Sequence, residues 1–124
     1  MSTYRPGYCN IGPRQRRRRF SLAVAVLLAA VGYVAACLTG VFPRVVLPGV
    51  FVPLTVGFEL LFQAVDAFCV RLAFLGQYDV HDDETTGTVR SAADRRADRA
   101  RAAKLSAAAI GCAGVLTLAV TLAA

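Results

Sequence analysis

The stretch RRRRFSLAVAVLLAAVGYVAACLTGV, residues 16–41, decides the fold of this chain. Four consecutive arginines run directly into 22 residues without a charge, Phe20–Val41. An α-helix needs about 20 apolar residues to cross the hydrocarbon core of a bilayer, so this run predicts a transmembrane helix. An arginine cluster at one end of a span marks the cytoplasmic side. We therefore interpret the cluster as a topology anchor, formed by Arg16, Arg17, Arg18 and Arg19.

The composition of the chain points to the same class. Of its 124 residues 56% are hydrophobic, and the net charge is +6. This apolar content exceeds what one domain of this size can hide in a core. A basic balance indicates nucleic acid or an anionic membrane surface, but the sequence shows no nucleic-acid-binding fold. We expect a multi-pass protein of the cell membrane whose partner is a bilayer with anionic headgroups, and no nucleic acid.

A second apolar stretch begins at Val45, directly after a short turn. Pro48 and Pro53 interrupt its first half, which predicts a kinked or extended start because proline lacks the N–H donor. We expect clean helix from about residue 54 to residue 75, ending at Gly76. Together with the first span, this stretch would form a transmembrane hairpin over residues 20–75.

A polar segment, residues 76–104, separates the hairpin from the last apolar run and is predicted to be an acidic loop followed by a charged helix. Ser91 stands three residues before Asp94, a spacing typical of a helix start. Asp98 is three residues from both Arg95 and Arg101, which favours ion pairs along the helix. We expect this helix to continue unbroken into a third span over residues 105–124.

The distribution of positive charge predicts the topology. Six arginines lie in the arm of residues 1–19, whose first 15 residues read as irregular, and seven cations lie in residues 71–104. The turn between the first two spans holds only Arg44. The positive-inside rule then places the N-terminus in the cytoplasm and the C-terminus outside. The predicted fold class is all-α, with three transmembrane helices and the third extended into the cytoplasm.

A second interpretation of the first span stays open. Residues 17–22, RRRFSL, fit a twin-arginine export signal, and residues 34–37, VAAC, fit a lipobox. Cleavage after residue 36 would leave Cys37 lipidated. The sequence after Cys37 is immediately apolar, unlike the polar tether of a lipoprotein, so the uncleaved hairpin is favoured.

Three polar residues of the second span share one helical face. Glu59, Gln63 and Asp66 stand at positions i, i+4 and i+7, and form an intramembrane polar stripe. Ionisable side chains inside a span are costly and indicate ion or proton handling, or pairing with a buried partner. Asp66 is expected near the cytoplasmic surface, within reach of Arg71 or the arginine cluster. Structural pairing or a subunit contact is favoured, with an ion- or proton-linked accessory subunit as the alternative.

Two of the four cysteines fall on the predicted cytoplasmic side. Cys9 and Cys69 could approach each other there, and disulfides are rarely kept in that compartment. With His81 they could hold a metal or a haem, although no CxxC or other ligand spacing supports this. We favour a packing role without a cofactor, with a metal- or haem-associated redox component as the alternative.

Small residues recur every four positions on two of the spans. Such spacing places them on one face, where another helix can approach closely. The function favoured by the sequence is a small non-enzymatic membrane protein, an interaction or accessory subunit that forms a homo-oligomer or binds a membrane protein partner. The two small-residue faces consist of Gly32, Ala36 and Gly40, and of Ala103, Ala107 and Gly111.

Short motifs on both sides of the hairpin carry a resemblance. They are CNIG at residues 9–12, QA at residues 63–64 and FCVR at residues 68–71. The chain resembles small uncharacterised prokaryotic multi-span membrane proteins with an N-terminal Cys-x-Ile-Gly, an Arg-rich arm and a Phe-Cys motif after the first hairpin. The resemblance implies no activity or ligand, but it directs attention to Cys9 and Cys69 as a pair. The acidic loop around Asp82 departs from that pattern.

Overall fold

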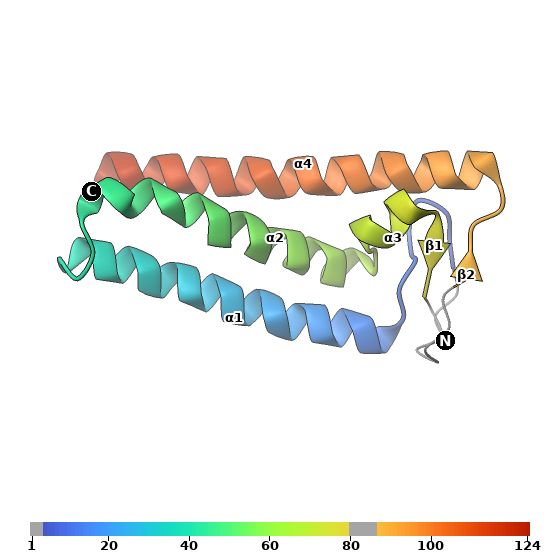
Figure 1. Ribbon diagram of the computed structural model, residues 1–124, viewed down its shortest axis with the longest axis horizontal. Coiled ribbons are helices and arrows are strands. Elements are labelled where there is room, and N and C mark those ends of the chain that lie inside the picture. Colours follow the sequence, from blue (N-terminus) through green and yellow to red (C-terminus); the bar gives the residue numbers. More distant parts are fainter. Residues whose placement is uncertain (1–3, 80–86) are drawn as a thin grey trace.

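The computed structural model describes residues 4–79 and 87–124, in which three long helices lie side by side in an elongated bundle (Figure 1). The long helices are α1 (Pro13–Leu38), α2 (Phe51–Asp66) and α4 (Ala92–Ala123). Shorter elements are the 3₁₀ helix η1 (Arg44–Val50), helix α3 (Val70–Leu75) and an antiparallel pair of strands, β1 (Gln77–Tyr78) and β2 (Gly87–Thr88). The predicted helical membrane fold is confirmed, because three helical segments are long and apolar enough to cross a membrane: Pro13–Leu38, Arg44–Asp66 and Ala92–Ala123.

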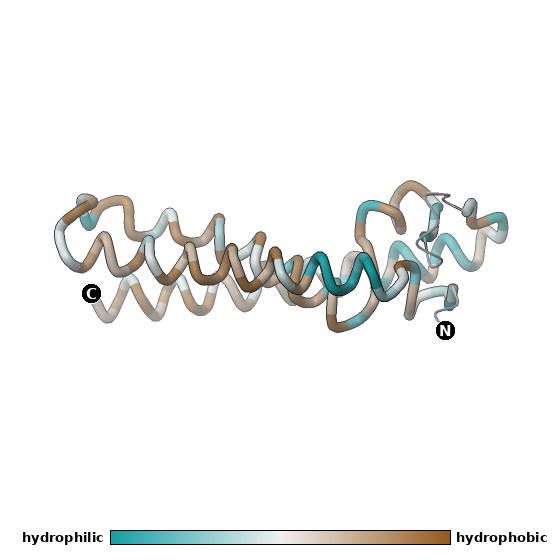
Figure 2. The backbone as a smooth tube through the Cα atoms, turned by 90° about the horizontal axis from the view of Figure 1, so that it is seen from below, coloured by the Kyte–Doolittle hydropathy of each residue, from teal (hydrophilic) through white to brown (hydrophobic). Residues whose placement is uncertain are grey.

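The bundle is polar at one end only. Hydrophilic residues gather at the end that holds the N-terminal arm, while most of the three long helices is hydrophobic (Figure 2). Helix α3, both strands and the start of α4 lie at this end, and the turn after α1 lies at the other, near the C-terminus (Figure 1). We call this end the polar head and define it as residues 4–19, 66–79 and 87–101.

Helix α1 begins at Pro13, seven residues before the predicted span. Proline is favoured in the first helical position, where its missing N–H would have no partner. The irregular arm therefore ends at Gly12, and the whole arginine cluster is helical. At the other end, Gly40 lies beyond the helix with a φ of +88°, a left-handed conformation that favours glycine. Gly40 thus serves the turn and does not share a helical face with Gly32.

The second span differs from its prediction at both ends. Its start is neither extended nor irregular, because Pro48 is accommodated in η1. Pro53 is the third residue of α2, where the N–H has no acceptor within the helix in any case. Helix α2 then stops at Asp66 and does not continue to residue 75, because Ala67 adopts a left-handed conformation with φ 53° and ψ 44°. The chain resumes as α3, which ends at Gly76 as predicted.

Helix α4 is continuous over 32 residues, as expected. Its N-terminus is capped by Ser91, whose Oγ accepts a hydrogen bond from the Asp94 N–H at 3.3 Å. At about 1.5 Å per residue it is about 48 Å long, more than the roughly 30 Å of a hydrocarbon core. Its first turns therefore extend beyond the apolar part of the bundle and form one side of the polar head.

Small residues bring the helices together, but they are not the ones predicted. The buried face of α1 carries Ala23, Ala30 and Cys37 at seven-residue spacing. In α2, a Cβ added at Gly57 would lie 2.5 Å from Leu27 Cδ2, so glycine permits the close approach of α1. The buried small residues of α4 are Ala102, Ala109 and Ala113.

The predicted small-residue faces point away from this interior. Ala103, Ala107 and Gly111 are all exposed, and an added Cβ at Gly111 would have no atom within 4 Å. The same is true of Gly32 on α1. The bundle therefore leaves both glycines on its outer surface.

The close approach at Gly57 can be tested by comparing two glycines. We expect Gly57→Val to lower the stability of the bundle by about 1–3 kcal/mol, because its side chain overlaps Leu27. The measurement is unfolding by sodium dodecyl sulfate in mixed micelles, followed by the helical circular dichroism signal. Gly32→Val is the matched control, since its site is open. Equal losses in the two variants would contradict the packing described here.

Candidate functional site

The break between α2 and α3 is held by a buried side chain from the N-terminal arm. The Nδ2 group of Asn10 donates to the carbonyl of Cys69 at 3.0 Å, and its Oδ1 accepts from the Cys69 N–H at 2.6 Å. The backbone N–H groups of Asn10 and Ile11 both donate to the carbonyl of Ala67, at 3.0 and 3.3 Å. Buried backbone groups need such partners. The arm therefore replaces the hydrogen bonds that the helix loses where it breaks.

Arg16 of α1 binds two more backbone carbonyls at this break. Its Nε donates to the carbonyl of Ala64 at 2.9 Å, and one terminal nitrogen donates to the carbonyl of Val65 at 3.2 Å. The last carbonyls of a helix have no partner within it, and a cation is favourable at that end of the helix dipole. One member of the predicted topology anchor thus caps α2.

Arg19 begins a polar chain that crosses the bundle. Its guanidinium donates to Gln63 Oε1 at 2.6 Å and contacts Cys69 Sγ at 3.1 Å. Gln63 Nε2 donates to Glu59 Oε1 at 3.4 Å, and the Ser106 hydroxyl of α4 donates to the same oxygen at 2.8 Å. This polar chain, from Arg19 through Gln63 and Glu59 to Ser106, links three helices. Two residues of the predicted stripe therefore have structural partners.

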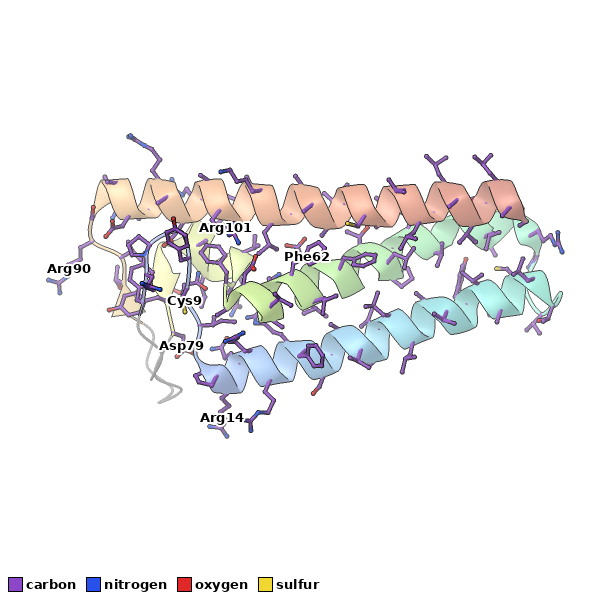
Figure 3. The ribbon with its side chains drawn as sticks, turned by 180° about the vertical axis from the view of Figure 1, so that it is seen from behind. Cys9, Arg14, Phe62, Asp79, Arg90 and Arg101 are labelled. Carbon is purple, nitrogen blue, oxygen red and sulfur yellow. The ribbon has the colours of Figure 1, made fainter. Side chains whose placement is uncertain are left out.

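The third residue of the stripe, Asp66, pairs with α4. Its carboxylate lies 2.7 Å from a terminal nitrogen of Arg101. From the sequence we expected Asp66 to pair with Arg71 or the arginine cluster, and Arg101 to pair with Asp98. Arg101 instead points from α4 toward the end of α2 (Figure 3). The ion pair fastens the last turn of α2 to the polar part of α4.

Asp98 is fully buried and binds the N-terminal arm through hydrogen bonds. It accepts hydrogen bonds from the Tyr4 hydroxyl at 2.5 Å and from the Gly7 N–H at 2.7 Å. The Tyr4 ring stacks on Tyr78 of β1 with centroids 4.5 Å apart. Burial, and then the hydrogen bond to Asp98, raise the pKa of the Tyr4 phenol, so it stays protonated and donating. Arg95, the other expected partner of Asp98, instead donates to backbone carbonyls before α4.

The structure brings Cys9 and Cys69 into one apolar cluster with Ile11, Ala67 and Leu72. Cys9 Sγ donates to the carbonyl of Ile11 at 3.5 Å, and both cysteines are free thiols. His81, the third predicted ligand, lies outside the described residues. Within residues 4–79 and 87–124, no three His, Cys, Asp or Glu side chains gather as a metal site would require. The metal or haem hypothesis stays a prediction.

Sequence reasoning gave no role to two residues that matter here, Asn10 and Ser106, and a different partner to a third, Arg101. Asn10 stood inside a noted motif, but nothing in its neighbourhood indicates a buried contact 59 positions away. Ser106 could have been found as the one hydroxyl among the alanines that begin the third span. Arg101 was noticed and assigned to a partner in its own helix, because local spacing cannot show contacts between helices.

No protein-family model matches the chain, and neither a curated protein nor a solved structure is significantly similar to it. A function for the chain must therefore be argued from the contacts described above.

The role of Asn10 predicts the reactivity of Cys69. Replacing Asn10 by Ala leaves the N–H and carbonyl of Cys69 buried without partners, at about 1–3 kcal/mol for each group. We expect Asn10→Ala to accelerate maleimide labelling of Cys69 about tenfold or more, because the break opens more often. The measurement is the labelling rate in detergent, with Cys9 and Cys112 replaced by Ser.

Tyr8→Ala is the matched control for this test, because Tyr8 belongs to the same arm but is 72% exposed. Its labelling rate should equal that of the parent. If Asn10→Ala also leaves the rate unchanged, the arm does not hold the break.

Proposed function

We propose that this chain is a small non-enzymatic integral membrane protein, an interaction or accessory subunit that packs sideways against a second copy or a membrane protein partner. The observation that carries the proposal is the outward position of the small-residue face of α4, Ala103, Ala107 and Gly111. Helices in lipid associate by close packing, which small residues permit. The bundle itself uses a different set of small residues.

The polar contacts between the helices favour this role over transport. Glu59 and Asp66 both have hydrogen-bond partners that join helices, Ser106 and Arg101 respectively. A carboxylate engaged in this way stabilises the helix arrangement. The ion- or proton-linked alternative needs a carboxylate that exchanges its partner, and the geometry offers no observation in favour of it.

We also propose that the polar head faces the cytoplasm of the cell membrane, with the C-terminus outside. The head holds the arginine cluster, Arg71 and the basic start of α4, whereas the opposite end of the described chain carries Arg44. Cytoplasmic ends of spans carry the excess of arginine and lysine. The arm and the end of α2 would then meet at the inner surface of the membrane.

The packing face can be tested with a cysteine placed on it, Ala107→Cys, in a chain whose Cys9 and Cys112 are replaced by Ser. Cys112 itself is exposed, but neighbouring residues of a helix do not face the same way, so it does not lie on the face of Gly111. We expect oxidation of membranes to crosslink two copies through the introduced cysteine, or mild-detergent purification to retain a partner. Gly111→Leu should reduce either product roughly fivefold or more, because a large side chain separates the helices, at about 1–2 kcal/mol.

Ala119→Leu is the control for the packing face, since Ala119 is exposed but lies outside the face. It should leave the product unchanged. Recovery of monomer alone with no partner, or equal losses in both variants, would contradict the proposed packing.

The orientation predicts which cysteine can be labelled in intact cells. With Cys9 and Cys112 replaced by Ser, a cysteine introduced as Ala124→Cys should react with a membrane-impermeant maleimide from outside. Tyr8→Cys should react only after permeabilisation, because the arm is expected on the cytoplasmic side. The reverse pattern would show that the orientation is wrong.

A further inference from the structure

A basic groove opens on the polar head between the start of α1, the middle of α2 and α3. It has a volume of about 330 Å³, and three guanidinium groups and one amide lie beside two leucines. None of its lining residues in the described part of the chain is a carboxylate. We call it the arginine groove; its lining residues are Gln15, Arg18, Arg19, Leu22, Leu60 and Arg71.

The positive charge of this groove is not used by the fold. Arg18 and Arg71 form no hydrogen bond or ion pair within residues 4–79 and 87–124. Arg19 holds Gln63 and Cys69 through its terminal nitrogens, but its Nε is buried with no acceptor in the described part of the chain. A buried donor without a partner is costly. The groove therefore contains two guanidinium groups, those of Arg18 and Arg71, whose charge and donors an anion would satisfy.

Among the described residues, the nearby carboxylates Asp66 and Asp79 do not supply that anion. Asp66 is paired with Arg101, on the side of α2 that faces α4. Asp79 accepts a hydrogen bond from Gln15 Nε2, and it is not among the residues that line the groove. The net charge of the lining is positive, so electrostatic complementarity selects a negatively charged occupant.

The kind of anion follows from the level of the groove relative to the membrane and from its apolar wall. Arg18 and Arg19 directly precede the apolar part of α1, where a membrane helix passes the level of the lipid headgroups. Leu22, one turn further along and 45% exposed, and Leu60 line the side of the groove toward the hydrocarbon. Guanidinium groups bind phosphate through paired, charge-assisted hydrogen bonds. A molecule with a phosphate at one end and acyl chains at the other would place the phosphate against the guanidinium groups and the chains against the leucines.

We propose that the arginine groove binds the phosphodiester headgroup of an anionic phospholipid, with Arg18 and Arg71 on the phosphate and the leucines against its acyl chains. The inference rests on the membrane insertion proposed above and does not depend on the lateral partner. The positive charge alone predicts a general attraction to anionic lipids, whereas this proposal names one defined binding site.

The adjacent groove supplies a matched control. It is lined by Arg16, Arg17 and Phe20, among others, on the other side of the start of α1. Arg16 is already committed to the carbonyls at the end of α2. Arg17 has the same charge as Arg18, belongs to the same turn and is also exposed, but lies outside the arginine groove.

The test measures lipid retention by the full chain. The protein is reconstituted in vesicles of phosphatidylcholine with phosphatidylglycerol, extracted in mild detergent and examined by native mass spectrometry. We expect one retained phosphatidylglycerol per chain and no preferential retention of phosphatidylcholine. Arg18→Gln with Arg71→Gln should lower retention about tenfold or more, because both charge-assisted contacts are lost. Arg17→Gln should retain lipid as the parent does.

Three results would overturn the proposal: no preference for phosphatidylglycerol in the parent, an equal loss in Arg17→Gln, or displacement of the lipid by inorganic phosphate at equal concentration. The last would identify a soluble phosphate as the ligand. Circular dichroism of each variant establishes that it is folded. Carbonate extraction of the parent protein from the vesicles tests membrane insertion separately from lipid binding. A protein that is extracted contradicts the proposed insertion. A protein that resists extraction but retains no phosphatidylglycerol contradicts only the proposed lipid site in the arginine groove.

Discussion

The structure depends on the hydrogen-bonding groups that are released where α2 breaks at Ala67. A helix that ends beside the hydrocarbon of a membrane exposes carbonyls that water cannot reach, and each unpaired group costs about 1–3 kcal/mol. Asn10 and Arg16 supply the partners from two other segments of the chain. The N-terminal arm is therefore part of the fold, because it supplies partners to the groups released at the break. Asp98 fixes the same arm to α4, so the break, the arm and the third helix are connected.

The arginine cluster is one motif in the sequence and three different features in the structure. Residues three apart lie on the same side of a helix. Arg16 and Arg19 therefore both face α2, where one caps the helix and the other enters the polar chain. Arg17 and Arg18 point to either side of that contact and line separate grooves. A charge count alone predicts an orientation in the membrane, whereas the helical periodicity explains why only part of the charge is used within the fold.

The features that were predicted correctly are those determined by nearby residues. Three spans follow from the length of the apolar runs, and the start of α4 and the end of α3 follow from Ser91 and Gly76. The features that could not be predicted depend on contacts between distant segments. Nothing at Ala67 indicates a left-handed residue, because the conformation is imposed by partners 57 positions earlier in the chain. The Asp66–Arg101 pair was missed for the same reason, since each residue also had an acceptable partner closer in sequence.

The two sets of small residues on α4 separate what packs within the chain from what would be free for the proposed partner. Ala102, Ala109 and Ala113 are buried, and their size lets α4 lie close to its neighbours within the chain. Gly111 contributes nothing to that contact, and glycine also weakens a helix by up to about 1 kcal/mol relative to alanine. A position that faces only lipid gains more from leucine or valine, which partition favourably into the bilayer. The outward position of Ala103, Ala107 and Gly111 is therefore not explained by packing within the chain, and it is this observation on which the proposal of lateral packing rests.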